Sequence, residues 1–362
     1  MMSRPLVDVR LDRLSTTAGP PPHLDAISVH VRYGELFTFV GPPHSGKSAV
    51  LRAIAGFLPL ASGRLVIDGE DIDGIPARRR GIGLVPHEGA LWPHMSAAHH
   101  VAFGLEQQGM SAADIASKVE TVLTRLGLAD VKEARPPALT LDQQRRLALA
   151  RALAVEPRVL LLDEPLAHLD PLHRKTLRIE VAKLHRDLAT TTICATRDAA
   201  DALALSDRIA VLVGGRVAQM GDAEEVYRHP VSRAVAEALG PANFLPVTVV
   251  EVRDLGVVVQ TERGDRVPVA GLGTFALGSR GQLVLRPETV SLTEAAEARG
   301  PGIPGHIALR VFEGARYVYE VDIGASAPAR VEVPSTGETR MFRLGERVRV
   351  EVSSDTVALI PD

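Results

Sequence analysis

The sequence is poor in cysteine, in long apolar runs and in net charge, and each shortage excludes a class of protein. A single cysteine, Cys194, excludes an internal disulfide framework and fits a reducing compartment. No apolar run approaches the roughly 20 residues that span a bilayer, and the opening MMSRPLVDVR lacks the apolar core and cleavage site of a signal peptide. We therefore expect a cytosolic protein.

The charge balance bears on the kind of partner. The 362 residues include 41 basic and 44 acidic side chains, which leave a formal net charge of −3. No global basic field therefore points to nucleic acid as a partner. With 46% hydrophobic and 23% charged residues the composition is that of a globular protein, and the length predicts two or three domains.

The first two thirds of the chain have the pattern of an α/β architecture. Up to about residue 240, short aliphatic runs alternate with longer helical patterns. The runs are bounded by turn or polar residues, which predicts buried strands at residues 36–40, 81–85, 159–163, 191–196 and 208–213. Ser111 and Asp114 form a capping-box pattern before an apolar stripe, so we expect a helix to begin there.

The remainder of the chain has the pattern of half-exposed strands. From about residue 243 the helical periodicity stops and apolar and polar residues alternate, which predicts a small all-β domain. LVLRPETVSL at 283–292 lines up with VEVSSDTVAL at 350–359, so we expect two similar β units side by side. The stretch 292–305, which carries Gly and Pro, would connect them.

A phosphate-binding loop is the most specific motif. GPPHSGKS at 41–48 fits G-x-x-x-x-G-K-[ST] and lies between an aliphatic strand and a helical pattern, as such a loop requires. Its backbone N–H groups would wrap the phosphates, Lys47 would neutralise the terminal ones, and the Ser48 hydroxyl would bind Mg²⁺. The predicted nucleotide-binding residues are Gly41, Pro42, Pro43, His44, Ser45, Gly46, Lys47, Ser48 and Ala49.

Two carboxylates supply a second, independent part of the same chemistry. VLLLDEP places Asp163 and Glu164 at the end of an aliphatic strand. Asp163 can hold the Mg²⁺ shell together with Ser48, and Glu164 can polarise an attacking water.

The order of these motifs resembles the ATP-binding subunit of an ATP-binding cassette (ABC) transporter over residues 4–240, and the β tail resembles the paired TOBE domains of importer subunits. The resemblance matches 84–105 to the Q-loop region, 138–153 to the signature helix, 166–170 to the D-loop with Asp170, and 195–203 to the switch region. It implies an α/β P-loop NTPase (ABC ATPase) domain at 1–240, with a helical subdomain at about 87–157. A small all-β, OB-like, paired TOBE domain would follow at 241–362.

The same resemblance implies the cofactors and partners. The chain would use ATP and Mg²⁺ as a peripheral subunit at the cytoplasmic face of the cell membrane. It would pair with a second ABC ATPase subunit, in a homodimer or a heterodimer, and dock on integral membrane permease subunits. An extracytoplasmic solute-binding protein would act on it indirectly. The junction ANFLP looks more like that of polyamine, ferric iron or phosphonate importers than that of sugar importers.

The signature helix departs from the family pattern at its start. The family has LSGGQ, whose backbone N–H groups point at the γ-phosphate held by the partner subunit. This chain has Leu139, Thr140, Leu141, Asp142 and Gln143. A carboxylate about 5 Å from one phosphate charge costs on the order of 3 kcal/mol at an effective dielectric of about 20, more than the roughly 0.3 to 1 kcal/mol from a helix dipole. Repulsion should therefore win unless Asp142 turns away.

Three further positions depart from the family. His87 replaces the Q-loop glutamine that reaches the metal and the attacking water, and Arg197 replaces the switch histidine that contacts the γ-phosphate. Both can still bind, because Arg197 is a cation and His87 can form hydrogen bonds. The aromatic that stacks on adenine aligns with Ala18, and His44 stands where the loop often has glycine, so its ring must point outward.

These departures lead to a hypothesis about activity. The chain binds Mg-nucleotide through Lys47, Ser48, Asp163 and Glu164, but hydrolyses it slowly. One alternative is a nucleotide-binding regulatory or scaffold subunit without turnover, paired with a competent ATPase. Another is a soluble ATPase acting on nucleic acid, which the β tail and the charge balance disfavour.

Weaker patterns leave alternatives open. Four histidines lie close in sequence: His87, His94, His99 and His100. They are either metal ligands or residues with ordinary polar or interface roles. Trp92, with Pro93 and Met95, is either an anchor for a helix of the membrane subunits or part of the core. Arg145 and Arg146 are expected to solvate the outer face of their helix or to pair locally.

Overall fold

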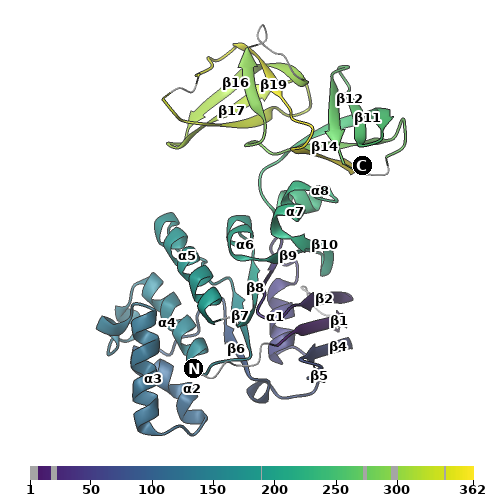
Figure 1. Ribbon diagram of the computed structural model, residues 1–362. Coiled ribbons are helices and arrows are strands. Elements are labelled where there is room, and N and C mark those ends of the chain that lie inside the picture. Colours follow the sequence, from purple (N-terminus) through teal and green to yellow (C-terminus); the bar gives the residue numbers. More distant parts are fainter. Residues whose placement is uncertain (1–6, 18–22, 189, 272–274, 295–300, 338–339) are drawn as a thin grey trace. The chain divides into compact units, whose positions relative to one another are not determined.

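The computed structural model describes residues 7–17, 23–188, 190–271, 275–294, 301–337 and 340–362 (Figure 1). The chain divides into two compact units, Met1–Ala223 and Glu224–Asp362. Helix α8 (Arg233–Ala238) falls in the second unit. The division between the units therefore lies ahead of the domain boundary expected near residue 240. The extent of the functional domains stays a prediction.

The first unit is organised by a six-stranded sheet of order β10-β9-β3-β8-β7-β6. Five strands are parallel and β10 is antiparallel to its neighbour β9. The strands are β3 (Leu36–Val40), β6 (Ile82–Val85), β7 (Val159–Asp163), β8 (Thr191–Thr196), β9 (Arg208–Val213) and β10 (Arg216–Asp222). The five strands predicted from the aliphatic runs are confirmed.

The aliphatic runs are continuous because this sheet is covered on both faces. In β7, Val159 and Leu161 face one apolar cluster, whereas Leu160 and Leu162 face the other. The first cluster contains α1 (Lys47–Ala55) and an antiparallel sheet of order β2-β1-β4-β5. The strands of that sheet are β1 (Val9–Ser15), β2 (Ile27–Val31), β4 (Ser62–Ile67) and β5 (Glu70–Asp71).

Helices cover the opposite face of the sheet (Figure 1). They are α2 (Ala97–Gln107), α3 (Ala112–Arg125), α4 (Leu141–Ala154) and α5 (Pro171–Leu188), with α6 (Ala199–Leu205) packed against β3 and β8. Short 3₁₀ turns lie at Ala77–Arg79, Ala129–Val131 and Pro136–Ala138. Ser111 caps α3 by accepting from the Asp114 N–H, as the capping pattern predicts.

The second unit contains two five-stranded sheets of order β13-β12-β11-β14-β20 and β15-β19-β16-β17-β18. They are preceded by α7 (Ala223–Arg228) and α8. The strands are β11 (Asn243–Arg253), β12 (Gly256–Thr261), β13 (Arg266–Ala270), β14 (Arg280–Leu285), β15 (Ser291–Glu294), β16 (Gly302–Phe312), β17 (Arg316–Asp322), β18 (Ala329–Pro334), β19 (Arg347–Glu351) and β20 (Val357–Pro361). The predicted all-β domain is confirmed.

The two sequence repeats pair with each other rather than forming separate units. Leu283 lies opposite Leu359 in one sheet, and Leu292 lies opposite Val350 in the other. Each repeat therefore crosses from one sheet to the other, in opposite directions. The side-by-side arrangement expected from the alignment is corrected to an exchange of strands, because each strand completes the sheet begun by the other repeat.

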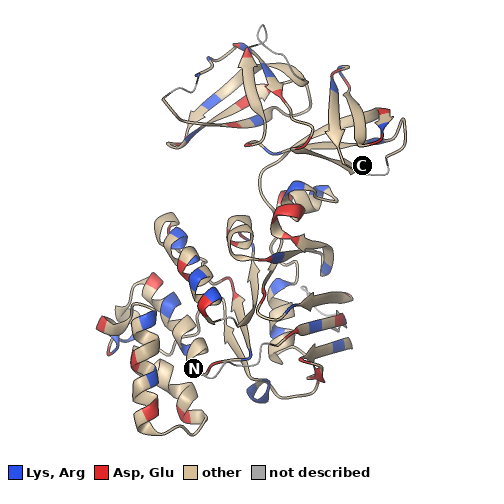
Figure 2. Cartoon of the chain, viewed as in Figure 1, with Lys and Arg blue, Asp and Glu red and all other residues tan. Residues whose placement is uncertain are grey.

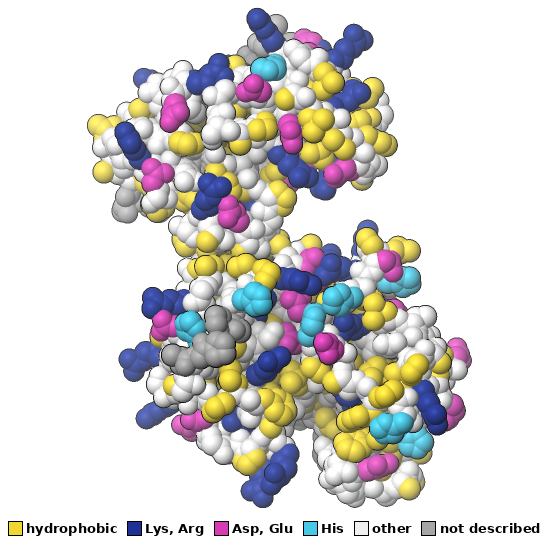
Figure 3. Space-filling model, turned by 180° about the vertical axis from the view of Figure 1, so that it is seen from behind, with side chains coloured by type: hydrophobic (Ala, Val, Ile, Leu, Met, Phe, Trp, Pro, Cys, Tyr) yellow, Lys and Arg dark blue, Asp and Glu magenta, His cyan; other side chains and the backbone are white. Residues whose placement is uncertain are grey.

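Charges of both signs are interspersed along the chain (Figure 2) and on the face drawn in Figure 3. Among the described residues, no helix has the length and apolarity needed to cross a membrane.

Arg286 ties the helices of the second unit to its strands. Its side chain is 4% exposed, and one guanidinium nitrogen donates to the carbonyl oxygens of Ala236, Gly240 and Pro241, each at 3.1 Å. The other terminal nitrogen donates to the Tyr227 carbonyl at 3.3 Å. The guanidinium lies 4.2 Å from the centroid of the Tyr227 ring. One cation therefore satisfies four backbone carbonyls.

We expect Arg286→Met to destabilise the second unit by about 3 kcal/mol, because four carbonyls lose a charged donor. Calorimetry of the full chain measures the change as a lower midpoint temperature of the unfolding transition assigned to this unit. Arg280→Met, at an exposed position, is the matched control. Equal midpoints for the two variants would contradict this role of Arg286.

Candidate functional site

The phosphate loop joins the end of β3 to the start of α1, and its backbone requires glycine at both ends. Gly41 has a φ of 156°, and a Cβ atom there would lie 2.2 Å from the carbonyl oxygen of Leu212. Gly46, the N-cap of α1, has a φ of 105°. His44 also has a positive φ, 60°, and is exposed, so its side chain faces solvent as expected. The loop thus presents the N-terminus of a nine-residue helix, a place that favours anions.

Lys47 is held inside this loop by its own backbone. Its ammonium donates to the carbonyl oxygens of Gly41 and Pro42, each at 2.8 Å, and to Ser45 Oγ at 3.2 Å. Burial lowers the pKa of Lys47, while the charges of Glu164 and Asp163 oppose that shift. A buried ammonium surrounded by neutral acceptors is well placed to receive an anion.

Ser48, in the first turn of α1, reaches Asp163 at the end of β7. The Ser48 hydroxyl donates to Asp163 Oδ1 at 2.8 Å. A hydroxyl and a carboxylate are hard oxygen donors of the kind that Mg²⁺ prefers, with water and phosphate oxygens completing the shell. These two side chains could therefore hold the ion.

Glu164 is fixed by the end of β8. It has a positive φ of 50°, and its N–H donates to the Ala195 carbonyl at 2.8 Å. Its carboxylate accepts from the Arg197 backbone N–H at 3.0 Å and from the Thr196 hydroxyl at 3.3 Å. The strand ends thus bring the candidate base next to the switch residue.

Arg197 itself is exposed, and its charge is one of those acting on Lys47. Its cation therefore lies near the ammonium of the phosphate loop, although histidine would be expected at this position from the family pattern. The arrangement adds positive charge where phosphate would bind.

His87 follows β6 and contacts a residue that the sequence did not single out. Its ring lies 5.3 Å, centroid to centroid, from that of His168, at an angle of 58°. His168 has a positive φ of 65° and lies between Glu164 and Asp170. Among the described residues, the buried Nδ1 of His87 has no hydrogen-bond partner.

The expectation for Arg145 is wrong, whereas that for Arg146 is confirmed. Arg145 is 7% exposed and donates to the His87 carbonyl rather than solvating the helix. Arg151, on the same helix, donates to the carbonyl oxygens of Gly89 at 2.8 Å and Ala90 at 2.6 Å. No periodic pattern distinguishes an inward arginine from a surface one, so the sequence did not identify this contact.

The start of α4 is closed by a capping box. The Gln143 N–H donates to the Thr140 hydroxyl at 3.2 Å, and the Thr140 N–H donates to Gln143 Oε1 at 2.9 Å. Leu139 is buried, and the side chain of Leu141 is 42% exposed. The helix start is thus a stable structure on its own, with an apolar side chain at its tip.

Asp142 turns toward its own helix. Arg146 Nε donates to Asp142 Oδ2 at 2.7 Å, and the same guanidinium also contacts Glu180. The cluster of two carboxylates and one guanidinium keeps a net charge of −1. The repulsion expected from Asp142 is therefore reduced, but not cancelled.

The signature and D-loop residues share one cavity in the first unit. Thr140, Leu141, Asp142 and Gln143 line it together with Asp170 and five other residues, and its volume is about 520 Å³. The Asp170 carboxylate contacts Nδ1 of the His173 ring at 2.5 Å. Hydrogen bonds from the His173 backbone N–H and from its ring lower the pKa of Asp170. Ala18 lies outside the described residues.

Trp92 lies half-buried on a small aromatic surface. Its ring contacts those of His100 and Phe103 at centroid distances of 5.4 and 5.0 Å, and the Arg151 guanidinium lies 5.0 Å from its centroid. Phe103 is 38% exposed. In the described part of the chain, no three His, Cys, Asp or Glu side chains are grouped as metal ligands.

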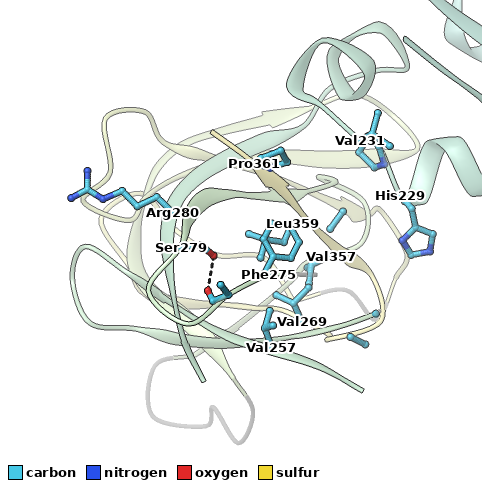
Figure 4. Close-up of a pocket in the computed structure, with 15 residues that line it drawn as sticks. His229, Val231, Val257, Val269, Phe275, Ser279, Arg280, Val357, Leu359 and Pro361 are labelled. Carbon is cyan, nitrogen blue, oxygen red and sulfur yellow. Dashed lines mark hydrogen bonds between the residues drawn. The ribbon is translucent and has the colours of Figure 1, made fainter. Parts of the chain in front are cut away.

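A second cavity lies within the second unit. Its volume is about 770 Å³, and Figure 4 shows Val257, Val269, Phe275 and Leu359 gathered in it, with the Arg280 side chain directed away from them. It offers apolar contact but no anchoring charge from Arg280.

Known proteins resemble this chain along most of its length. Residues 24–167 match the family model described as ABC transporter, and residues 283–360 match the TOBE domain. The maltose/maltodextrin import ATP-binding protein MalK of Photorhabdus laumondii is 36% identical over 340 residues, which are 92% of this chain and 88% of that protein. The spermidine/putrescine import ATP-binding protein PotA 1 of Pseudomonas aeruginosa is 36% identical over 346 residues, or 94% and 93%.

A solved structure is also similar. The structure of cbiO1 from Clostridium perfringens, part of the ABC transporter complex cbiONQ, is 30% identical with a TM-score of 0.56. The match covers 60% of this chain and 90% of that one.

The buried ring of His100 supports the loop at Trp92. The buried ring accepts from the Trp92 N–H at Nε2 and donates from Nδ1 to the Ser96 carbonyl, each at 2.8 Å. Burial is the main cause that lowers the pKa of His100 below its ordinary 6.5. The hydrogen bond to the Ser96 carbonyl opposes the shift, and the charges of Arg151, His94 and His99 add to it.

Because the unfolded chain binds the proton more tightly, we expect stability to fall as the pH drops below about 6.5, by up to about 1.4 kcal/mol per pH unit from this group, until the folded pKa is passed. Thermal midpoints between pH 8 and 5 measure this loss. His100→Gln, which cannot titrate but can accept from the same N–H, should flatten the slope, and the exposed His94→Gln should not. Equal slopes in both variants would exclude His100 as the source.

Proposed function

Because the chain belongs to the ABC transporter ATP-binding proteins, with a C-terminal TOBE domain, we propose that it is the ATP-binding subunit of an importer and that it hydrolyses ATP slowly. The observation that carries the proposal is the contrast between an intact phosphate site and an altered signature turn. Lys47, Ser48, Asp163 and Glu164 converge at one edge of the sheet, whereas the signature turn carries Leu141 and Asp142.

Nucleotide binding is supported by the residues at the strand ends. The loop amides and Lys47 would hold the phosphates, and Ser48 and Asp163 would hold Mg²⁺, which supplies charge neutralisation when bound. Glu164 is positioned by Thr196 and the Arg197 N–H to orient a water. Arg197 and His87 would contact the γ-phosphate side in place of the residues usual in the family.

A second cassette subunit would complete the site. The cavity that joins the signature turn to Asp170 is where a partner's nucleotide would bind, in a homodimer or a heterodimer. Closure of the pair around ATP would move the attached permease subunits. Each chain then supplies its altered signature to the other site.

The altered signature turn would weaken contact with the nucleotide of the partner subunit for two reasons. Leu141 adds an exposed apolar side chain at the tip of the helix, where close backbone approach is needed. The net charge of the Asp142, Arg146 and Glu180 cluster is −1, which repels an anion more than the helix dipole attracts it. Slow hydrolysis, rather than its absence, follows because Arg146 compensates part of the charge.

The membrane partners would dock at the aromatic surface. Trp92 and Phe103 are partly exposed beside the segment that carries His87, so a helix of a permease subunit could bind there and sense the Q-loop. The relatives are named as importers of maltodextrins in one case and of polyamines in the other, so we propose import without naming the solute. The chain would act as a peripheral subunit on the cytoplasmic face.

The direct test is ATP turnover of the purified full chain with Mg²⁺. We expect a rate below about 1 s⁻¹, yet above that of Glu164→Gln, which removes the group that orients the water. A wild-type rate at or above about 1 s⁻¹ would contradict weakened hydrolysis. A rate equal to that of Glu164→Gln, with ATP bound, would favour the regulatory subunit without turnover.

Substitutions at Leu141 and Asp142 separate the effect of the apolar side chain from the effect of the negative charge. We expect Leu141→Gly with Asp142→Gly to raise turnover about tenfold, which corresponds to about 1.4 kcal/mol of transition-state stabilisation. Asp142→Asn alone tests the charge, and Leu141→Gly alone tests the side chain. No gain in any of the three would show that the turn is not limiting.

A further inference from the structure

Arg145 carries a positive charge that is buried without an acidic partner. It lies on α4 and is 7% exposed, and in the described part of the chain no carboxylate forms an ion pair with it. Its Nε is buried and has no hydrogen-bond partner among the described residues. Burial lowers its pKa, with no opposing charge to raise it.

Such an arrangement does not stabilise a fold. Removing a guanidinium from water costs several kcal/mol, and a single backbone carbonyl returns little of it. Arg286 differs, because four carbonyls surround it. A local arrangement that costs stability points to a functional role.

The contact of Arg145 is with the segment that follows β6. It donates to the carbonyl of His87, and Arg151 donates to those of Gly89 and Ala90. Gly89 and Ala90 have positive φ angles of 72° and 46°, and a Cβ atom on Gly89 would lie 3.6 Å from that of Ala148 on α4. Two arginines of one helix thus hold the segment against that helix.

The His87 ring depends on this contact for its position. Its Nδ1 lacks a partner in the described residues, and its ring contact is with the exposed His168. Since no side-chain hydrogen bond within the described part of the chain orients the ring, its placement follows from the backbone that Arg145 holds. The same helix begins at the signature turn, so one rigid element reaches from Leu141 to the Q-loop.

We propose that Arg145 is a positioning residue that fixes His87 to the signature helix, so that His87 moves with the helix when nucleotide binds. The proposal rests on the proposed function, because it requires that the chain bind ATP. It assigns the buried charge to the orientation of one peptide, not to the stability of the fold.

The test compares the full-length wild type with Arg145→Met, Arg145→Lys and a control, Arg125→Met. Arg125 lies on α3 and pairs with Asp187 at 3.0 Å on the surface. Three quantities are measured: ATP affinity, the kcat and KM of ATP hydrolysis, and the thermal midpoint.

We expect Arg145→Met to lower kcat about tenfold, with ATP affinity and KM unchanged within about twofold. The thermal midpoint should stay within about 3 °C, because an apolar side chain replaces an unpaired buried charge. Arg145→Lys, which can still donate to the His87 carbonyl, should recover part of kcat, and Arg125→Met should match wild type.

A second readout does not need hydrolysis. Trp92 is the single tryptophan, and it lies at the end of the held segment. We expect ATP to change the fluorescence of wild type and of Arg125→Met, and the change to be smaller in Arg145→Met at saturating ATP.

The outcomes separate the two proposals. A wild type that binds no ATP overturns the proposed function. A wild type that binds ATP, together with an Arg145→Met variant equal to it in both kcat and fluorescence, overturns the positioning role alone. Parallel losses of affinity, kcat and thermal midpoint in Arg145→Met would also overturn it, because they indicate a structural role.

Discussion

The shared register of the parallel strands β3, β8, β7 and β6 is the constraint on which the rest of the candidate site depends. Val40 lies beside Thr196, Leu162 beside Cys194, and Val85 beside Leu162, so the residues that follow these strands emerge at one edge. The phosphate loop, the two carboxylates, the switch and the Q-loop meet there because the strands end together. Burial on both faces holds that register, since a shifted strand would lose apolar contacts with two clusters.

The residues at the signature turn stabilise the start of α4, but they also place a carboxylate and an apolar side chain there. The capping box and the ion pair of Asp142 with Arg146 make the helix start stable in the single chain. The same groups leave a net negative charge and a projecting leucine where an anion would approach. Under the proposed function, this net charge would weaken contact with a partner's phosphate, and the ion pair with Arg146 would reduce that penalty.

The parts of the fold that could be predicted are those encoded locally. Continuous aliphatic runs predicted the central strands, and the loop motif predicted the connection between β3 and α1, because both depend on neighbouring residues. The exchange of strands between the β sheets could not be predicted, since either pairing satisfies the same alternation. The contacts of Arg145 with His87 and of His168 with His87 join residues far apart in sequence, and a helical arginine has no local feature that distinguishes an inward from an outward direction.

We propose that the chain binds nucleotide but closes only weakly around it. Sedimentation of the full-length Glu164→Gln variant with and without Mg-ATP tests it most directly, because that variant keeps bound nucleotide from turning over. We expect saturable ATP binding with only weak self-association when Mg-ATP is added. A stable dimer that forms only with Mg-ATP would contradict weakened closure, because the signature turn would then readily accept the partner's triphosphate.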